Sequence, residues 1–499
     1  MRLKLSVSRE FSLDSVPKNS DVLPFLSEGA GARLETLLRR KTIRTISGIA
    51  IVTAITKPFD CPHGTCTFCP GGVRFGTPQS YTRNSPAAAF GINRDFDPIK
   101  QVKDTLEFLS RNGHDTSKVE LILLGGTILA MPPQYQESFV KGCFDALNSS
   151  VGDSLGDSIA KNENSSHRCV GLTIETKPDW CGKDHVDRLL SYGTTRVEIG
   201  VQSLREKVLK FSNRGHDVSD TLASFQVSKD AALKVVAHMM PGLPLSDPDS
   251  DLADLENLFS DERFRPDMLK IYPTLVVEGT ALYQQYKMGL YSPYSLDQLK
   301  EILCKFKSSV PQWVRIMRIQ REIPRNEIAD GEKAGNLRQI ILEEMKKRGL
   351  RCNCIRCREV GHNSSKYTGD LELKRIDYPA SGGSEVFLSF EDAGSIIFGF
   401  LRLRIPSGEE FRPEIRNERA ALVRELHVYG PVVPVGKSSH DDSRSQHHGL
   451  GTRLLSEAER ISREFSRSKL VVISAVGTRE YYRKRGFSDD GVYVSKRLS

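Results

Sequence analysis

Short apolar runs rich in Ile, Val and Thr alternate with longer amphipathic segments along the first part of the chain. Such runs are typical of strands that are buried on both faces of a parallel sheet. Six strands are predicted, at residues 48–56, 119–124, 169–175, 196–201, 234–239 and 268–273, with helices at 99–111 and 136–147 between some of them. The alternation predicts an α/β fold with right-handed crossovers, and its length favours an open or partial barrel. The polar stretch 148–168 is predicted to be a surface loop.

A different pattern follows in the last quarter of the chain. Apolar runs at 385–390, 395–404 and 421–428 predict antiparallel strands. A polar loop at 436–446, a helix at 450–465, a strand at 469–476 and a short helix are predicted after them. We therefore expect a second, separate α+β domain.

Composition narrows the class of protein. Of the 499 residues, 38% are hydrophobic and 27% are charged, which is typical of globular domains. The N-terminus lacks an apolar signal core, and no apolar run approaches the ~18 residues that cross a bilayer. We therefore expect a cytoplasmic protein with no membrane partner. The formal net charge, 71 basic minus 63 acidic residues or +8, fits simple solubility as well as a polyanionic partner.

Three of the ten cysteines lie close together near the N-terminus. The cytosol keeps thiols reduced, so clustered cysteines are more often metal ligands than disulfides. Cys61, Cys66 and Cys69 directly follow the first predicted strand, at the end where parallel barrels carry their chemistry. Three thiolates with no evident fourth protein ligand suit an iron–sulfur cluster with one open iron. A structural zinc loop completed by His63 is the alternative.

A second group, Cys352, Cys354 and Cys357, has C-x-C-x2-C spacing. This spacing favours zinc, which prefers tetrahedral sulfur and nitrogen ligands and can stabilise a segment too short to build its own core. The fourth ligand stays open among His362, another cysteine and water. A second iron–sulfur cluster is the alternative. The remaining cysteines are predicted to be structural.

The C-terminal domain carries an anion-binding pattern. The sequence QHHGLGT at 446–452 follows a strand and opens the helix predicted at 450–465. Small residues at a helix N-terminus let backbone N–H groups surround a pyrophosphate. The pattern resembles the coenzyme A loop of Gcn5-related acetyltransferases (GNAT). The resemblance nominates as acetyl-CoA contacts Gln446, Gly449, Leu450, Gly451, Thr452 and the strand residues Glu425, Leu426, His427 and Val428.

Two adjacent tyrosines lie in the last predicted helix. In the GNAT fold a tyrosine here can hydrogen-bond the thioester sulfur or protonate a leaving thiolate. Tyr482 is therefore nominated as a catalytic residue that also contacts the cofactor, and Tyr481 as a further cofactor contact. Packing is the alternative for both. Glu425 could also act as a general base, although backbone contact and packing explain it equally well.

Longer motifs carry a resemblance over nearly the whole chain. They are RTISGIA at 44–50, CPHGTCTFCPGG at 61–72, SKVELILLGGT at 117–127, TIETKPDW at 173–180, RVEIGVQS at 196–203, NRGH at 213–216, VVAHMMPGLP at 235–244 and KIYPTLVVEGT at 270–280. In these segments the chain resembles the Elp3 family, which comprises the catalytic subunit of Elongator and its archaeal relatives. Lys177, where the family usually has Arg, and Arg83-Asn84-Ser85, in place of Gly-x-Glu, depart from the pattern.

The resemblance implies an architecture with four parts. These are a basic helical segment at 1–45, a radical S-adenosylmethionine (SAM) domain with a partial (βα)6 barrel at 46–345, a cysteine-rich zinc-binding linker at 346–370 and an α+β GNAT acetyltransferase domain at 371–499. Cys61, Cys66 and Cys69 would bind a [4Fe–4S] cluster, and SAM would chelate its fourth iron. Zinc in the linker would be structural.

The resemblance also nominates residues of the barrel. Gly125 and Gly126 would let the backbone approach SAM closely, which a Cβ would hinder. Lys118 would contact acetyl-CoA, although without the resemblance it is only a charged residue before a strand. The polar residues Glu175, Glu198 and Gln202 lie on or just after predicted strands, where they could face SAM or substrate or else form hydrogen bonds inside the barrel.

A radical generator joined to an acetyl-CoA domain is coherent if the acetyl group must become a carbon radical, because ordinary acetyl transfer needs no cluster. The resemblance implies that a SAM-derived radical activates the acetyl methyl group, which adds to C5 of uridine 34 in tRNA. Thioester hydrolysis then leaves 5-carboxymethyluridine. The expected partner is the anticodon stem-loop, whose wobble base must leave its stack. A homodimer is compatible with this scheme.

Basic residues in two segments are candidate tRNA contacts: Arg39, Arg40, Lys41, Arg44, Arg315, Arg318, Arg321 and Arg325. Two other classes of function remain open. A protein lysine acetyltransferase with a structural cluster would acetylate peptides without SAM or reductant. A non-catalytic tRNA-binding scaffold is disfavoured because both cofactor signatures are intact.

Overall fold

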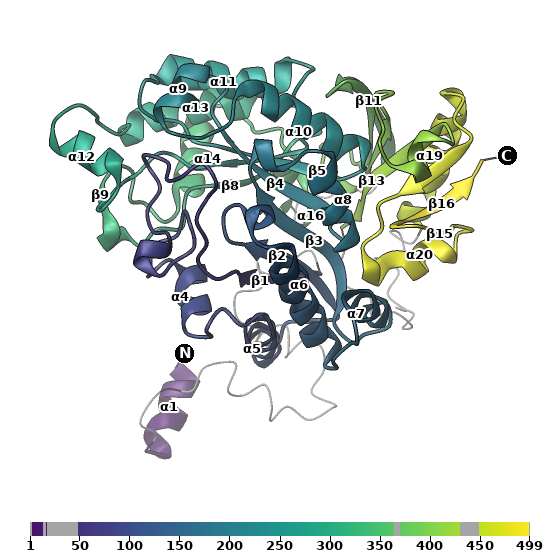
Figure 1. Ribbon diagram of the computed structural model, residues 1–499, viewed down its shortest axis with the longest axis horizontal. Coiled ribbons are helices and arrows are strands. Elements are labelled where there is room, and N and C mark those ends of the chain that lie inside the picture. The colour runs from purple at the N-terminus through teal and green to yellow at the C-terminus, as the bar shows by residue number, and fades with distance from the viewer. Residues whose placement is uncertain (1, 13–15, 17–47, 364–369, 430–448, 499) are drawn as a thin grey trace.

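The computed structural model describes residues 2–12, 16, 48–363, 370–429 and 449–498 (Figure 1). Two seven-stranded sheets organise this part of the chain. Helix α1 (Arg2–Glu10) precedes them. Three sequence predictions lie outside the described residues: the basic run at 39–44, the loop at 436–446 and the cofactor contact Gln446.

The first sheet is parallel throughout, with the strand order β1-β2-β3-β4-β5-β6-β8. Its strands are β1 (Ala50–Ile55), β2 (Lys118–Leu124), β3 (Arg168–Thr176), β4 (Arg196–Gln202), β5 (Lys234–Met239), β6 (Met268–Ile271) and β8 (Arg315–Ile319). The sheet curls but does not close, since β1 and β8 are its two edges, so the predicted partial barrel is confirmed. All six predicted strands are present. The seventh, β8, was missed because two arginines interrupt the short apolar run in its sequence RIMRI.

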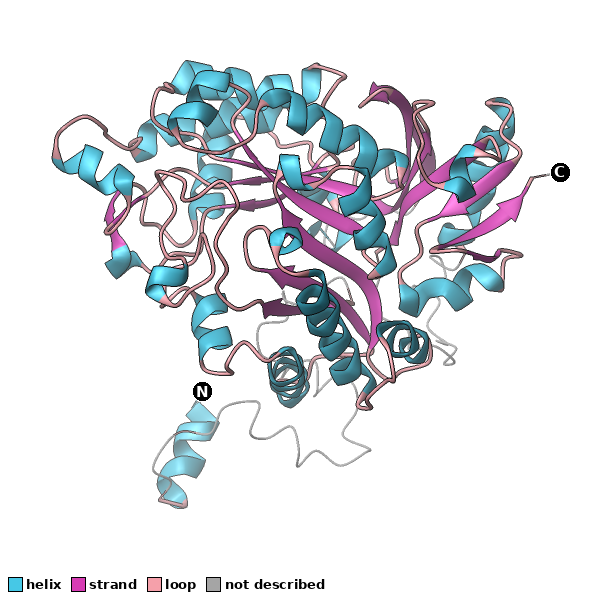
Figure 2. Ribbon diagram, viewed as in Figure 1, coloured by secondary structure: helices cyan, strands magenta, loops and turns pink. Residues whose placement is uncertain are grey.

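Helices connect the strands, and most of them cover the outer face of this half-barrel (Figures 1 and 2). They are α4 (Pro86–Ile92), α5 (Pro98–Arg111), α6 (Pro133–Asn148), α7 (Leu155–Asn162), α8 (Lys183–Ser191), α9 (Glu206–Phe211), α10 (Val218–Asp230), α11 (Pro248–Ser260), α12 (Ala281–Lys287), α13 (Leu296–Ser309) and α14 (Leu337–Lys347). A small antiparallel sheet of two strands, β7 (Val276–Val277) and β9 (Ile328–Asp330), lies beside them. No helix of the described residues is long and apolar enough to cross a membrane.

Helix α5 illustrates how local sequence sets this packing. The Asp97 carboxylate accepts hydrogen bonds from the N–H groups of Ile99 and Lys100, and Pro98 occupies the first turn, where no N–H is needed. On its buried face, the Gln101 side chain bonds both the N–H and the C=O of Ile55, at 2.9 and 3.0 Å. The helix is thereby fastened to the last residue of β1, next to the cysteine loop.

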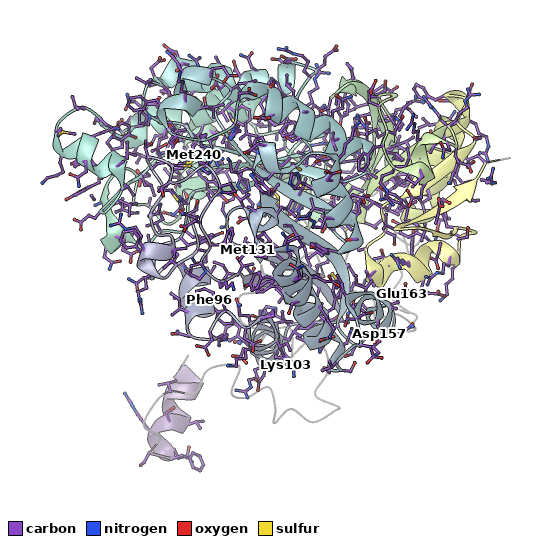
Figure 3. The ribbon with its side chains drawn as sticks, in the orientation of Figure 1. Phe96, Lys103, Met131, Asp157, Glu163 and Met240 are labelled. Carbon is purple, nitrogen blue, oxygen red and sulfur yellow. The ribbon has the colours of Figure 1, made fainter. Side chains whose placement is uncertain are left out.

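The stretch 148–168, expected to be a surface loop, contains helix α7. Ser154 caps it, its hydroxyl accepting from the Asp157 N–H. Only Leu155 and Ile159 among its residues are large and apolar, too few to show a helical period in the sequence. Glu163, just after the helix, pairs with Arg479 and Arg483 of the C-terminal domain, and Figure 3 shows it at that boundary.

The second sheet has the order β10-β11-β12-β13-β14-β16-β15. Its strands are β10 (Glu372–Ala380), β11 (Gly383–Glu391), β12 (Ile397–Ile405), β13 (Ala420–Val428), β14 (Lys469–Val472), β15 (Ser488–Asp490) and β16 (Tyr493–Arg497). Its helices are α17 (Pro413–Arg416), α19 (Leu450–Glu464) and α20 (Arg479–Arg483). The expected α+β content is confirmed, although β10 was missed because charged residues interrupt its sequence ELKRIDYPA.

The two sheets share one hydrophobic core. One face of the second sheet packs under α19, through Leu401, Leu403 and the helix residue Leu454. The other face, which includes Phe387 and Phe400, belongs to the core of the half-barrel. Every residue of β12 is therefore buried. The C-terminal domain therefore packs against the half-barrel through a shared apolar interface.

Charged side chains also lie inside this interface. Arg402, Arg404 and Arg424 are completely buried on β12 and β13. Arg424 pairs with Asp267, which precedes β6, and Arg404 pairs with Asp230 at 2.7 Å. These acids lie near the N-terminal ends of the barrel strands, so the second sheet closes the end of the half-barrel opposite the cysteine loop.

Candidate active site

A cavity of about 460 Å³ occupies the inside of the half-barrel toward the C-terminal ends of its strands. Inward-facing side chains of β1 to β6 and β8 form its walls. The cysteine loop after β1 and residues 79–81 cover one side. Met240, labelled in Figure 3, lines it just after β5. Carboxyl ends of parallel strands are where such folds place ligands.

The first three cysteines gather on this side of the cavity. Cys66 and Cys69 are buried, and Cys61 is half-buried. The Ser80 N–H donates to the Cys69 sulfur at 3.1 Å, and an Arg214 N–H donates to the Cys66 sulfur at 3.3 Å. Burial raises the pKa of Cys69 to about 12, which a bound metal would reverse, because thiolates and not thiols ligate metals.

The donor set fits an iron–sulfur cluster. Among the described residues, the groups of three Cys, His or carboxylate ligand atoms within 4.8 Å of one another are Cys352-Cys354-Cys357 and Glu175-Glu198-His238. Cys61, Cys66 and Cys69 do not form such a group, so their sulfur atoms are not arranged around a single ion. A cubane cluster distributes its thiolates over three irons and so needs a wider arrangement. Cationic Arg214 beside Cys66 suits the negative charge of thiolate-bound iron.

A cradle for a second ligand lies next to the cysteines. Gly125 and Gly126 have φ angles of +150° and +76°, and a Cβ on Gly125 would lie 2.0 Å from the Thr56 hydroxyl. Gln202 also has a positive φ, +73°, and its buried Oε1 has no hydrogen-bond partner. Glycine adopts such angles freely, whereas in Gln202 the positive φ is backbone strain of the kind found at ligand sites. These residues therefore fit the SAM site that the family resemblance implies.

Polar side chains form a band across the cavity wall. Strand pairing places Glu175 opposite Glu198, and His238 opposite Lys270. One carboxylate oxygen of Glu198 accepts from both Lys270 and His238, the latter at 3.0 Å. Burial opposes the charge on Glu198, but Lys270 and His238 outweigh it and lower the pKa of this carboxyl. The pKa of Glu175 is raised to about 7 by burial and by the charge of Glu198, and the Tyr81 hydroxyl donates to it at 3.2 Å.

The second cysteine group lies between the sheets. Cys352, Cys354 and Cys357 precede or belong to helix α15 (Ile355–Arg358), which is followed by α16 (Val360–Asn363). Lys307 donates to the Cys352 sulfur at 3.2 Å. His362, the candidate fourth ligand, bonds Glu359 at 3.1 Å instead of joining the three sulfurs. The spacing of the three sulfur atoms suits a single bound metal ion.

In the C-terminal domain, two strands separate where the cofactor contacts were predicted. β13 pairs with β14 only from Ala420 to Val423, and β13 then continues to Val428 paired with β12 alone within the described residues. A bulge at Arg424 marks the change. The backbone edge of 425–428 is thus available to a ligand that forms strand-like hydrogen bonds. Glu425 and His427 turn toward the barrel, where Glu425 pairs with Arg402 at 2.9 Å.

The start of α19 lies against the end of β13. Gly449 has a φ of +94° at the helix N-terminus, and Leu450 and Gly451 are buried. A Cβ on Gly451 would lie 2.5 Å from the Tyr481 hydroxyl and 3.6 Å from Val428. Tyr481 therefore borders the predicted cofactor loop. Tyr482 instead packs in the core, edge-on to Phe487 with ring centroids 5.8 Å apart.

The structure separates the predicted tRNA contacts. Arg325 is exposed, and Arg318 lines the cavity. Arg321 turns inward and donates to the Ser80 carbonyl at 2.9 Å. Arg315 is enclosed by Glu359, at 2.7 Å, and Tyr429. The expectation that Arg315 meets RNA does not fit this geometry. Lys118 is half-buried at the start of β2, and burial lowers its pKa.

Some cavity residues were missed at the level of sequence. They are Tyr81, Arg214, His238, Lys270 and Tyr272. The signal that could have found three of them is alternation, because His238, Lys270 and Tyr272 are polar residues at every second position of otherwise apolar strands or just after them. That pattern is expected of a lumen that holds a ligand.

Comparison with known proteins agrees with this architecture. Family models match residues 57–255 (Radical SAM superfamily), 266–347 (Radical_SAM C-terminal domain) and 1–46 (ELP3 N-terminal domain). The chain is 47% identical to the tRNA uridine(34) acetyltransferase of Methanocaldococcus jannaschii, covering 97% of this chain and 90% of that protein. It is 42% identical to Homo sapiens Elongator complex protein 3, covering 100% and 93% respectively.

A solved structure gives the same result. The archaeal Methanocaldococcus infernus Elp3 with an N-terminal deletion superposes with a TM-score of 0.80 at 43% identity, covering 91% of this chain and 100% of that one. The half-barrel, its cysteine loop and the family models therefore define a radical SAM enzyme. Within that class the chain belongs to the Elp3 family, with which it shares nearly its full length.

Proposed function

We propose that this protein modifies wobble uridine 34 of tRNA, using SAM and acetyl-CoA to build a carboxymethyl group on C5. The observation that carries the proposal is the presence, in one molecule, of a three-cysteine cavity and an open strand edge next to a helix N-terminus. The relatives named tRNA uridine(34) acetyltransferase support the substrate.

The cysteine side of the cavity would hold the cluster and SAM. When bound, this pair supplies a carbon-centred radical able to remove a hydrogen atom from a methyl group. Arg214 and Lys177 place positive charge beside the thiolates, since Lys177 bonds His63, which in turn contacts Cys66 at 3.2 Å. Burial and Lys177 lower the pKa of His63 to about 3, so this imidazole is neutral at pH 7. The enclosed walls would keep water from the reacting carbon.

The C-terminal domain would hold acetyl-CoA in the manner of a GNAT domain. The pantetheine would continue the sheet along 425–428, and the pyrophosphate would meet the N–H groups at Gly449 to Thr452. Tyr481 would border this site. The catalytic role predicted for Tyr482, which is to hydrogen-bond the thioester sulfur or protonate the leaving thiolate, requires its hydroxyl to reach the cofactor from the core. Lys118 would add a contact from the barrel.

Domain boundaries at 45, 345 and 370 are proposed on the same grounds, with zinc as the ion of the linker. Zinc would hold 352–357 against β8, to which the segment is already fastened by the bond from the Ile355 N–H to the Val314 carbonyl at 2.9 Å. The tRNA would approach from the cavity side, near Arg318 and Arg325.

The test is anaerobic turnover followed by nucleoside mass spectrometry. Cluster-loaded protein receives dithionite, SAM, acetyl-CoA and unmodified tRNA, and 5-carboxymethyluridine is expected. Cys66→Ala should abolish it together with 5′-deoxyadenosine, because the cluster loses a ligand. Cys143→Ala, which removes a buried cysteine far along the chain from the loop, is the control and should retain both products. Peptide acetylation without SAM or reductant, and no modified uridine, would favour the lysine acetyltransferase.

A further inference from the structure

The wall of the cavity has two chemically different halves. On β1 and β2 the inward-facing residues are mainly apolar, among them Ile55, Ile122 and Leu124. On β3 to β6 and β8 they are polar. The strand register pairs Glu175 with Glu198, and Lys270 with both His238 and Arg318. The hydrogen bond between His238 and Glu198 joins these two sets into a continuous band. An apolar face opposite a band of donors and acceptors suits a flat, heteroaromatic ligand that stacks on one side and is read along its edge.

Glu198 is the unusual member of the band. Its side chain is completely buried, and both polar neighbours, Lys270 and His238, bond to the same oxygen, Oε2. The other oxygen, Oε1, has no hydrogen-bond partner, although Glu198 lines the cavity. A buried, charged acceptor without a donor is costly unless a ligand supplies one.

The groups beside Glu198 are donors. Lys270 carries an ammonium group, and Tyr272, whose ring lies edge-on to His238 at 5.3 Å between centroids, carries a hydroxyl; both line the cavity. The site therefore presents an acceptor with donors next to it. Uracil has the complementary edge, because its N3–H lies between the carbonyl oxygens O2 and O4. Cytosine does not, since its N3 is an acceptor and its C4 carries an amino group.

We propose that Glu198 accepts the N3–H of the flipped uracil, with Lys270 and Tyr272 donating to its carbonyl oxygens, so that this band selects uridine over cytidine at position 34. The inference rests on the proposed function and names its specificity determinant. Reading an extruded base along its Watson–Crick edge is the usual way in which base-flipping enzymes choose their substrate.

The experiment compares two anticodon stem-loops that differ only in U34 or C34. Their dissociation constants for the cluster-loaded protein with SAM, but without reductant, are measured by fluorescence anisotropy. Wild-type protein should prefer U34 by about ten- to a hundredfold, the range for one well-formed base-reading contact. Glu198→Gln should lose most of this preference, because an amide can turn either its donor or its acceptor toward N3. Glu198→Asp, which keeps the carboxylate, should retain part of it.

Glu120→Gln is the matched control. Glu120 is also a carboxylate inside the barrel with a cationic partner, Arg196, but it does not line the cavity. The Glu120→Gln protein should prefer U34 over C34 as strongly as the wild type does. If thermal melting shows that Glu198→Gln is not folded, the double variant Glu198→Gln/Lys270→Gln is measured instead. It removes both buried charges and so leaves neither without a partner.

Two results would overturn the inference. One is a U34 preference in Glu198→Gln equal to that of the wild type. The other is a Glu198→Gln variant that no longer binds SAM, as measured by equilibrium dialysis, but keeps its preference for U34. That result would assign the band to SAM. Failure of the proposed function gives a different result from failure of this inference. In that case the wild-type protein would form no 5-carboxymethyluridine, even if it binds U34 in preference to C34.

Discussion

Each completely buried arginine of the interface between the sheets depends on an acid from another segment. Arg424 donates to Asp267 and also to the Leu233 carbonyl, at 2.6 Å, so its charge and its hydrogen bonds are both satisfied. Removing one partner leaves an uncompensated charge in the interior, which is more costly than never having buried the pair.

Arg424→Met should therefore lower the free energy of unfolding by about 3–5 kcal/mol, the usual cost of breaking a buried ion pair. The measurement is the midpoint of urea unfolding. Arg460→Met on the exposed side of α19 removes an arginine that pairs with Glu457 and Glu464 in solvent, and it should change the midpoint little. An Arg424→Met protein as stable as the control variant would show that the pair does not support the interface.

The cysteines could be predicted at the residue scale because ligand spacing is local in sequence. Glu198 was foreseen as a polar barrel residue, whereas Lys270 and His238 were not singled out. Their meaning depends on the strand register, which places three strands side by side and turns their side chains into one band. Alternation along each strand could mark Lys270 and His238 as facing the lumen, but only the register shows that they meet Glu198.

At the scale of elements, six strands and the helices α5, α6 and α19 could be predicted, because their hydrophobic periods are strong. β8 and β10 could not, since polar residues interrupt both. The structure explains the polar residues of β8. Arg315 faces the interface between the sheets, and Arg318 faces the cavity. Residues 425–428 of β13 look like any strand in sequence, although the departure of β14 leaves them one open edge.

The opening of α19 allows a direct test of the acetyl-CoA site. In Gly451→Val the new side chain would collide with the Tyr481 hydroxyl and narrow the predicted pyrophosphate loop. The affinity for coenzyme A, measured by isothermal titration calorimetry, should fall at least about tenfold, as expected when a loop that wraps an anion is blocked. Ser456→Ala, at an exposed position of the same helix, should bind as the wild type does.

The short segment around α15 makes a prediction about metal content. Wild-type protein purified without added metal should contain about one equivalent of zinc by mass spectrometry of the metal, since three gathered sulfurs suit a tetrahedral ion. Cys354→Ser should contain none and should melt at a lower temperature, because the segment between the sheets loses its cross-link. Cys304→Ser, a buried cysteine outside this group, should keep the zinc. Absence of zinc, together with more iron than the cluster of the first cysteine loop accounts for, would instead identify a second cluster.

At the scale of the whole molecule, the two sheets are joined by a shared apolar interface. The stacking of Trp313 on Tyr378, with ring centroids 4.2 Å apart, joins the half-barrel to β10. Calorimetry should accordingly show both sheets unfolding in a single transition. Two well-separated transitions would contradict this expectation. The sequence predicted a separate C-terminal domain from its strand pattern, and it gave no sign of this interface, because Arg402 and Arg404 alternate with apolar residues as solvent-facing positions do.

Acid should weaken this structure in a defined pH range. Burial opposes the charge of Asp267, but Arg424 and Arg402 outweigh it, so its pKa in the folded protein is below the ordinary value of 3.8. A lowered carboxyl pKa contributes stability that is fully present above the unfolded value and is lost as the pH falls through the folded one. Urea midpoints should therefore fall steeply as the pH drops below about 4. In Asp267→Asn with Arg424→Met the decline should be shallower.

The position of the second sheet has a consequence for synthesis on the ribosome. Translation proceeds from the N-terminus, so Asp230 and Asp267 emerge well before β12 and β13 deliver their arginines. Until then the open end of the nascent half-barrel exposes both acids and the apolar surface around Trp313. The last quarter of the chain thus completes the folding of the preceding three quarters. A ribosome that stops before residue 424 releases a half-barrel without the sheet that closes its end.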